Sequence, residues 1–431
     1  MRATPPVLVI LLSVLSVPAA WGGEFRAAVA KVDVTPENLP RLLGYAPRQA
    51  TGVNDRLYHR ILALDDGATQ FFLVSSEFGC ISPALYDRVS ATLAREHGIA
   101  AGSVWWTLTH THSAPEVGSP GLLVAFLGER FLQPFDVAYA ALVERRLIEG
   151  VLDVRARLEP ARLGVGWGFS QANINRRARL PDGRTTLGMN PDGPVDRRIG
   201  VLRLEKPDGS LLALVANYAI HGTVLGSQNL LISGDVSGVV SSYVERKTGV
   251  PLLFINGAAG DLAPIYSGTA GLKEGQLGQF EILLGDRILE ASAKIAGAIS
   301  GANIKLSSLT VETPQKPGLT WPAELADYAR TNAAGERLVR IPVRFLQVND
   351  DVAIWSAPLE LFCEVSNGIR DQSPFPYTFY FGYANGWLGY LPSAAESGRG
   401  GYEPMVSPFT AAAADDLARA VTSHLEGVAR R

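Results

Sequence analysis

Apolar residues along this chain occur mainly in short runs separated by turn signals, a pattern that predicts β-strands joined by hairpins. The runs at 60–64 and 70–75 flank Asp65-Asp66-Gly67, and the run at 201–204 is joined through Pro207-Asp208-Gly209 to a strand starting at Leu211. A third hairpin is expected to turn at Asn349-Asp350-Asp351. Asp-Gly and similar pairs favour such turns because they tolerate positive φ. Further buried strands are expected at 104–108 and 251–255.

Helical signals alternate with these strands. A helix is expected to begin after Ser82, a good N-cap, and to end at Gly98. Another is expected over 235–248, with Asp235 as its N-cap and Gly249 as its end. The remaining helices are predicted over 135–155, 276–299 and 412–428.

This alternation of hairpins and helical crossovers predicts an α/β fold with mixed β-sheets flanked by helices. The sequence contains no repeat and no long linker, and the small polar stretch 267–271 fits a surface loop. With 47% hydrophobic residues, the chain can bury a large core. We therefore expect residues 23–431 to form a single α/β domain.

The first 22 residues have the features of a signal peptide. Arg2 precedes an apolar stretch at 7–17, which is too short to span a bilayer, and small residues allow cleavage after Gly22. No later segment has 18 uninterrupted apolar residues, so no transmembrane helix is expected in the mature chain. We expect an exported protein, either secreted or periplasmic.

The charge of the chain argues against nucleic-acid binding, and its cysteine content allows two redox states. The net charge of −3 offers no basic surface for nucleic acid, and the sequence has no Gly-rich phosphate-binding loop. The two cysteines, Cys80 and Cys363, could pair in an oxidising compartment or remain buried thiols, and the sequence leaves both readings open.

Three of the six histidines indicate a metal site. His110 and His112 follow a predicted strand, and in an extended backbone residues two apart project from the same face. His221 lies at the end of the apolar run that starts at Leu211. Because open α/β sheets build their sites at strand ends, these imidazoles are expected to share a zinc-type site.

Several segments, taken in order, make the chain resemble the N-terminal catalytic domain of the neutral/alkaline (non-lysosomal) ceramidases. They follow predicted strands or contain short polar motifs, and their shared order over nearly the whole mature chain is more specific than any one of them. The segments are Val32-Asp33-Val34-Thr35-Pro36, His110-Thr111-His112, Asn173-Ile174-Asn175-Arg176, His221-Gly222-Thr223, Ile232-Ser233-Gly234-Asp235, Gly260-Asp261-Leu262-Ala263-Pro264, Pro358-Leu359-Glu360 and the stretch from Asn385 to Tyr390.

The resemblance implies a Zn²⁺ site and assigns its ligands by motif position. Two histidines, a glutamate and a tyrosine hold the metal in that family, and the matching residues here are His110, His221, Glu360 and Tyr390. His112 is then the candidate proton-transfer group. Arg176 is the candidate for oxyanion stabilisation or for gripping a polar group of the substrate.

The acidic residues of the motifs are expected to support the metal ligands. Asp261 and Asp235 are the candidates for orienting a ligand histidine through its second ring nitrogen. The apolar segment 122–127, soon after His112, could line an acyl-chain pocket or belong to the core.

Two positions depart from the family's pattern. The glycine before the glutamate is Leu359, and the serine implicated in catalysis is Ala263. The sequence therefore predicts an exported zinc hydrolase that cleaves an amide, of N-acyl or lipid-like type, with metal-activated water. Peripheral contact with a membrane would suit such a substrate. The alternatives are a zinc esterase, lactonase or small-amide hydrolase with the same site, and a binding protein with a degenerate site.

Overall fold

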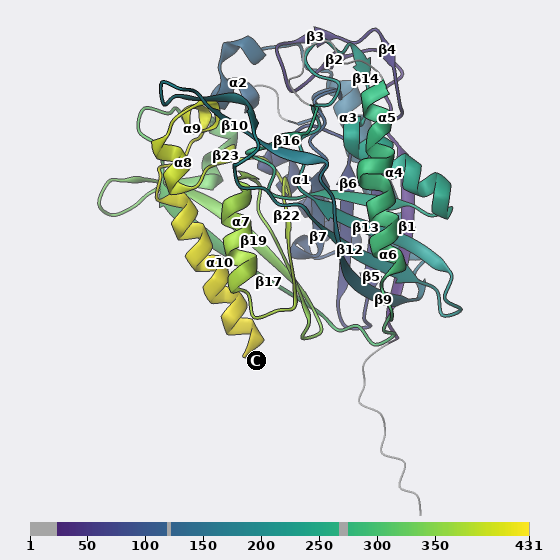
Figure 1. Cartoon of the computed structure of the whole chain (residues 1–431). Helices are drawn as coiled ribbons and strands as arrows, with labels where there is room; N and C mark the ends of the chain where they lie inside the picture. Colours follow the sequence, from purple (N-terminus) through teal and green to yellow (C-terminus); the bar gives the residue numbers. More distant parts are fainter. Residues whose placement is uncertain (1–23, 119–121, 267–274, 431) are drawn as a thin grey trace, which may run out of the picture.

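The computed structural model of the chain describes residues 24–118, 122–266 and 275–430, and its frame consists of three β-sheets (Figure 1). The first sheet has the order β7-β6-β5-β1-β8, with strands Val104–Leu108, Gln70–Ser76, Tyr58–Asp65, Arg26–Asp33 and Glu159–Pro160. The second has the order β15-β13-β12-β9, with strands Leu252–Asn256, Leu211–Tyr218, Arg198–Glu205 and Arg162–Phe169. The third has the order β17-β19-β20-β22, with strands Ile304–Pro314, Arg337–Val348, Val352–Ser356 and Tyr377–Phe381, and β18 (Ala329–Thr331) pairs with β19.

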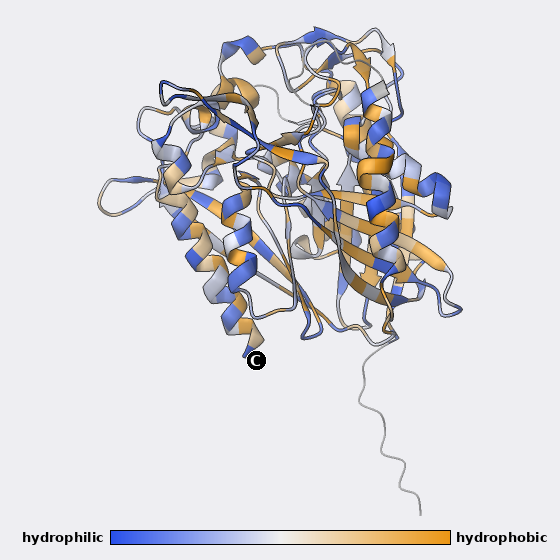
Figure 2. Ribbon diagram, viewed as in Figure 1, coloured by the Kyte–Doolittle hydropathy of each residue, from blue (hydrophilic) through white to orange (hydrophobic). Residues whose placement is uncertain are grey.

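A buried apolar core lies where the three sheets face one another. Every second residue of these strands points toward it, as the two-residue period of a strand requires. Its members include Leu62 and Trp105 from the first sheet, Val215 and Ile255 from the second, and Ile354 and Phe381 from the third. Figure 2 shows apolar residues concentrated in these strands. This shared core ties the three sheets together and fixes where their strands end.

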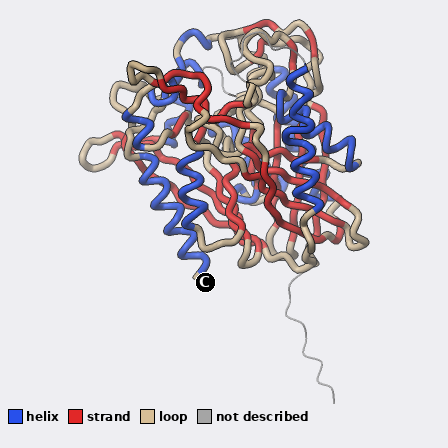
Figure 3. Tube along the Cα trace, in the orientation of Figure 1, coloured by secondary structure: helices blue, strands red, loops and turns tan. Residues whose placement is uncertain are grey.

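Helices cover the opposite faces of the sheets (Figure 3). Helices α1 (Pro83–His97) and α3 (Val137–Ala156) pack on the first sheet. Helices α4 (Asp235–Thr248), α5 (Gly275–Phe280) and α6 (Arg287–Ala293) pack on the second. Helices α7 (Cys363–Gln372) and α10 (Ala413–Ala429) pack on the third. The predicted α/β class, with mixed sheets flanked by helices, is confirmed.

Short elements cover the edge of the sheets at which β7, β13, β15 and β20 end. The short strands are β2 (Arg41–Leu42), β3 (Arg48–Gln49), β4 (Gly52–Val53), β10 (Asn173–Arg179), β11 (Thr185–Asn190), β14 (Leu231–Ile232), β16 (Leu262–Pro264), β21 (Glu360–Leu361) and β23 (Tyr390–Leu391). The short helices are α2 (Leu122–Leu127), α8 (Ala394–Gly398) and α9 (Tyr402–Val406). Elsewhere, 3₁₀ turns lie at Glu129–Phe131, at Ala323–Tyr328 and at Ala101–Ser103, the last directly before β7.

The hairpin predictions hold in detail, and so do the predicted caps of α1. All three predicted hairpins are antiparallel pairs in the structure, namely β5–β6, β12–β13 and β19–β20. The Ser82 side chain accepts a hydrogen bond from the main chain of Ala84 at the start of α1, and Gly98 ends that helix with φ of 64°. Glycine adopts this left-handed conformation without the steric cost that a Cβ brings.

Two helix predictions need correction. The helix predicted over 276–299 consists of α5, a π-helical turn at Glu281–Asp286 (η3) and α6, and it ends at Ala293. The chain beyond is drawn to the second sheet, where Ile299 forms a bridge with Leu163. In α4, Gly234 holds the N-cap position, and Asp235 has φ of 52°. The Asp235 carboxylate accepts from the main chain of the next residue, Val236, over 2.7 Å. It therefore contacts the helix start from one position beyond the N-cap, the position predicted for it.

The remaining predictions concern the signal peptide, one loop, the two cysteines and the absence of a transmembrane helix. The signal peptide (residues 1–22) and the loop at 267–271 lie outside the described residues. Cys80 and Cys363 are unpaired, buried thiols. None of the helices formed by the described residues is long and apolar enough to cross a membrane.

Candidate metal centre

The predicted site residues come together at the covered edge of the three sheets. His110 and His112 follow β7, His221 follows β13, Glu360 belongs to β21, and Tyr390 belongs to β23. Strands β21 and β23 pair in parallel with Glu360 opposite Tyr390. Residues separated by much of the sequence are thus neighbours at a point where strand ends meet.

The two histidines of the H-x-H motif converge for a different reason than predicted. His110 has φ of 61°, so the segment is not extended, and the expected alternation of a strand does not apply. The chain after β13 crosses it closely, and a Cβ at Gly222 would lie 2.6 Å from the Cα of Thr111. The Nε2 atoms of His110 and His112 nevertheless lie 3.3 Å apart.

Main-chain carbonyls fix the protonation of both predicted ligand histidines. Nδ1 of His110 lies 2.6 Å from the carbonyl oxygen of Gly79, and Nδ1 of His221 lies 2.7 Å from that of Ala259. Because a carbonyl oxygen can only accept, each Nδ1 carries the hydrogen and each neutral ring keeps a lone pair on Nε2. Nη1 of Arg176, which can only donate, lies 3.0 Å from Nε2 of His221 and requires the same tautomer.

These lone pairs face a buried carboxylate. Oε2 of Glu360 lies 3.2 Å from Nε2 of His110 and 3.3 Å from Nε2 of His221, and it has no hydrogen-bond donor of its own. All three side chains are less than 10% exposed. Three electron-pair donors at this distance repel one another unless a cation lies among them. Two neutral imidazoles and one carboxylate are also a common zinc ligand set, so these residues fit a metal ion.

Burial keeps the imidazoles of His112 and His221 neutral. Burial, assisted by the charge of Arg176, lowers the pKa of His221 to about 4. Burial and the neighbouring His110 and His221 hold the pKa of His112 well below its ordinary value. Both rings are therefore unprotonated at neutral pH, each with a nitrogen lone pair available.

His112 offers a second way to complete a metal site. The ring nitrogens of His110, His112 and His221 lie within 4.8 Å of one another, so these three histidines could hold a metal ion. The His112 ring is partly exposed and packs edge-on against Tyr45, with ring centroids 4.9 Å apart. Gly44, with φ of 97°, lies against the same ring, and any Cβ there would overlap it. No sequence motif predicted that Gly44 and Tyr45 would lie at the site.

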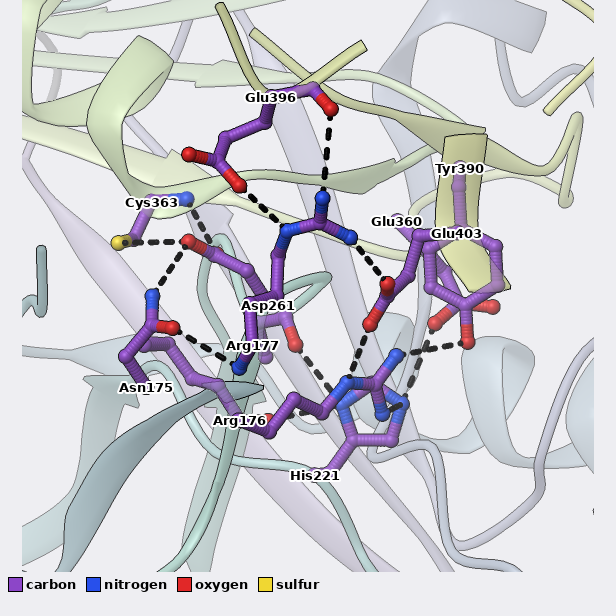
Figure 4. Close-up of polar contacts among 12 residues, drawn as sticks. Asn175, Arg176, Arg177, His221, Asp261, Glu360, Cys363, Tyr390, Glu396 and Glu403 are labelled. Atoms are coloured by element: carbon purple, nitrogen blue, oxygen red, sulfur yellow. Dashed lines mark hydrogen bonds and ion pairs between the residues drawn. The ribbon is translucent and has the colours of Figure 1, made fainter. Parts of the chain in front are cut away.

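Tyr390 and Arg176 form the other side of the site (Figure 4). Nη2 of Arg176 donates to the Tyr390 hydroxyl over 3.2 Å. Burial and the charge of Glu360 raise the pKa of Tyr390 well above its ordinary value, so the hydroxyl stays protonated in these surroundings. A cation beside it would reverse this shift and allow the oxygen to act as a ligand.

Two aromatic residues that the motifs did not assign a role support the donor set. Nε1 of Trp387 donates to Oε1 of Glu360 over 2.8 Å and so leaves Oε2 directed at the histidines. The Tyr383 ring stacks on His110 with centroids 4.3 Å apart. Trp387 lies in the 385–390 segment that stood out by its polar and small residues, whereas no sequence signal pointed to Tyr383.

The acidic residues predicted to orient a ligand histidine accept hydrogen bonds from other groups. Asp261 accepts hydrogen bonds from the main chain of Cys363 (2.8 Å) and from the side chain of Asn175 (3.1 Å). Asp235 accepts from the main-chain nitrogens of Val224 and Leu225, just after His221. The partners of Nδ1 are carbonyl oxygens instead, so Asp261 and Asp235 hold the loops that carry the ligands rather than their rings.

Asp261 gives a test of this structural role through the pH dependence of stability. Burial raises the pKa of Asp261 to about 7, although the Cys363 main chain donates to it. Since an unfolded aspartate titrates near ~3.9, this group stabilises the fold in acid, and the contribution is lost as the pH rises through 7. Between pH 5 and 8 in chelator, wild type should lose about 1–3 kcal/mol of unfolding free energy relative to Asp261→Asn.

Urea unfolding of both proteins at the two pH values measures this difference. Asp350→Asn, in the exposed β19–β20 turn, is the matched control. Parallel stability profiles of wild type and Asp261→Asn would contradict the assignment of Asp261 as a buried, protonatable support of the loop.

Comparison with known proteins places this chain in a family. Residues 25–281 match the family described as neutral/alkaline non-lysosomal ceramidase, N-terminal. The neutral ceramidase of Pseudomonas aeruginosa is 28% identical over 276 residues, which cover 61% of this chain and 40% of that protein. The neutral ceramidase of Mycobacterium tuberculosis is 26% identical over 224 residues, which cover 48% and 33% of the respective chains. The matches thus span less than half the length of these relatives.

The fold extends further than the detectable sequence similarity. A crystal structure of the Pseudomonas aeruginosa neutral ceramidase superimposes with a TM-score of 0.75 at 19% identity, covering 95% of this chain and 75% of that one. A structure described as a ceramidase complexed with C2 gives a TM-score of 0.76 at 18% identity. The motif order noted in the sequence, the fold and the matched residues agree. The chain belongs to the neutral/alkaline non-lysosomal ceramidase family.

Proposed function

We propose that this chain is an exported, zinc-dependent hydrolase that cleaves the amide bond of an N-acyl, lipid-like compound. The observation that carries the proposal is the buried convergence of two imidazole lone pairs on the Glu360 carboxylate in a member of the ceramidase family. We further propose that residues 23–431 form one catalytic domain, behind a signal peptide at residues 1–22.

His110, His221 and Glu360 would hold the ion, with Tyr390 as the fourth ligand. Zn²⁺ bound by these residues would supply Lewis-acid chemistry, activating water and polarising the carbonyl group of the substrate. The carbonyl contacts of His110 and His221 preorganise both rings for this role, because they fix the tautomer before any ion binds. Tyr390 is supported as the fourth ligand by its register opposite Glu360.

His112 and Arg176 would carry the remaining chemistry. His112 is a neutral base at the partly exposed side of the site, suited to accept a proton from the attacking water and to return it to the leaving amine. Arg176 keeps its charge at every accessible pH, and its Nη atoms point into the site. It is suited to stabilise the negative charge that develops on the carbonyl oxygen.

A cluster of buried aromatic residues adjoins the donor set. The Trp387 ring, which donates to Glu360, packs edge-on against Phe126 of α2 with centroids 5.5 Å apart. Phe126 in turn packs against Trp321 at 5.6 Å. Helix α2, singled out in the sequence, thus lies one aromatic ring away from the proposed ligand carboxylate. Its Leu122, Leu123 and Phe126 belong to the buried core, so the partly buried Val124, Ala125 and Leu127 are the side chains that would meet an acyl chain. Contact of this side with a membrane would be peripheral.

Ala263 keeps a second function open. Without the serine of the family motif, the same centre could act on an ester, a lactone or a small amide, or bind an acyl compound without turnover. The three functions are separated by zinc analysis of the purified protein together with a panel of N-acyl amides, esters and lactones. We expect about one zinc per chain and amide hydrolysis that chelation abolishes and added zinc restores. Zinc-free protein with full activity, or zinc-loaded protein without turnover of any amide, would overturn the proposal.

A further inference from the structure

A network of buried ion pairs joins the proposed site to the segment 394–406, which contains α8 and α9 (Figure 4). Its centre is Arg177, whose side chain is 1% exposed. The Nε of Arg177 donates to Glu396 over 2.6 Å, and Nη1 donates to Glu403 over 2.6 Å. Nη2 donates to the carbonyl oxygens of Gly400 (2.6 Å) and Glu396 (3.3 Å). All three nitrogens of this guanidinium are committed to holding one segment.

Glu403 connects this network to Arg176. Its Oε1 accepts from Nε of Arg176 over 2.9 Å, while its Oε2 accepts from Nη1 of Arg177. The Glu403 side chain is 1% exposed, so water does not compete for these bonds. Because the Nε contact fixes the plane of the Arg176 guanidinium, its two Nη atoms are directed at His221 and Tyr390.

The contact between Nε of Arg176 and Glu403 becomes more important when a metal ion is bound. An ion held by Nε2 of His221 and the hydroxyl of Tyr390 would use the lone pairs that Arg176 contacts through Nη1 and Nη2. Glu403 is then the acceptor that still fixes Arg176, and both Nη atoms are free to meet the substrate.

We propose that Glu403 is a positioning residue that aims the Arg176 guanidinium at the reacting carbonyl, and that Arg177 holds Glu403 in place. This inference rests on the proposed function, because it assumes that Arg176 stabilises the transition state of acyl hydrolysis. It extends that function to two residues that do not touch the substrate.

The decisive variant is Glu403→Gln, which preserves the shape of the side chain. It removes the charge between two buried arginines and turns an NH₂ group toward one of them, where only an acceptor can satisfy the donors. A small misorientation of a catalytic group lowers turnover by about 100-fold. We expect kcat to fall by about 10- to 100-fold in zinc-loaded, folded protein, with a smaller change in KM and an unchanged zinc content.

A double-mutant cycle separates positioning from general destabilisation. If Glu403 acts through Arg176, Glu403→Gln should cost little further activity in an Arg176→Lys background, because the guanidinium that it orients is already gone. Glu403→Asp keeps the charge and should recover part of kcat. Glu312→Gln is the matched control, since Glu312 also lies between two arginines, Arg330 and Arg340, but on the exposed strand β17.

The outcomes distinguish the two levels of inference. If wild type hydrolyses no acyl compound in the panel, the proposed function fails and the positioning role fails with it. If wild type is active and Glu403→Gln keeps its kcat, or loses as much in the Arg176→Lys background as alone, the positioning role alone is wrong. Should Glu403→Gln not fold, as shown by circular dichroism, Glu403→Asp decides: an unchanged kcat there overturns the positioning role.

Discussion

Replacing His221 with alanine is expected to lower the zinc affinity of the protein by more than about 100-fold. Removing a residue that merely supports a metal ligand costs up to about 100-fold, and the loss of a ligand itself should cost more. His221 is fully buried, and its Nε2 carries one of the two imidazole lone pairs that face Glu360. An alanine removes that lone pair and leaves a cavity in its place. Competition with a chromophoric chelator measures the affinity, and hydrolysis of an N-acyl amide should be lost in parallel.

The same measurement decides which residue completes the site. With Tyr390 as the fourth ligand, Tyr390→Phe should weaken zinc binding, whereas His112→Ala should keep the zinc and lose turnover by about 100-fold or more. His97→Ala, in the last turn of α1, is the control. If His112→Ala loses the zinc and Tyr390→Phe keeps it, the three histidines form the ligand set and the assignment taken from the family is wrong.

Long-chain ceramide is expected to be a poor substrate for the wild-type protein, and Ala263→Ser should raise its turnover by about 10- to 100-fold. This range corresponds to one hydrogen bond to a charged or reacting group, about 1.5–3 kcal/mol. Position 263 lies next to the donor set, because the carbonyl oxygen of Leu262 accepts from Nδ1 of His221 over 3.0 Å. Ala263 itself has no hydroxyl to offer. A site without this partner should favour shorter or differently decorated acyl compounds.

Rates of wild type and Ala263→Ser on long-chain ceramide, short N-acyl amides and esters test this expectation. Ala263→Cys, which is close to serine in shape but is only a weak hydrogen-bond donor, controls for the change in side-chain volume. Efficient ceramide turnover by the wild-type protein would show that the serine is dispensable in this chain.

Local features of the fold were predictable because each depends on a few neighbouring residues. Helix α1 begins after Ser82 and ends before Gly98 as predicted, since a side-chain acceptor and a residue without Cβ determine both ends. The hairpins follow in the same way from Asp-Gly and Asn-Asp turns. The two helix errors arose where tertiary contacts prevail, as at Ile299, which pairs with Leu163 in place of continuing the helix.

The site was predictable only through the order of its motifs. No periodicity relates position 110 to position 390, so the residues alone suggested a shared site for three histidines and nothing about Glu360 or Tyr390. The geometric reason given for the H-x-H motif was wrong, because the left-handed conformation of His110 depends on its surroundings. The pairing of Arg177 with Glu403 could not be predicted either, because two residues 226 positions apart leave no local pattern in the sequence.

The parallel pairing of Glu360 with Tyr390, two residues long on each side, makes the site sensitive to register. A slip of either strand by one residue would turn the side chain of its ligand to the other face and would remove that ligand from the site. The other ligands follow strands of the first and second sheets, so a chain with any one sheet unformed lacks part of the donor set. A bound ion would therefore recognise only completely folded molecules. Under the proposed function, the chain would acquire its metal only after folding, and the metal supply at that stage would decide how much of the protein is active.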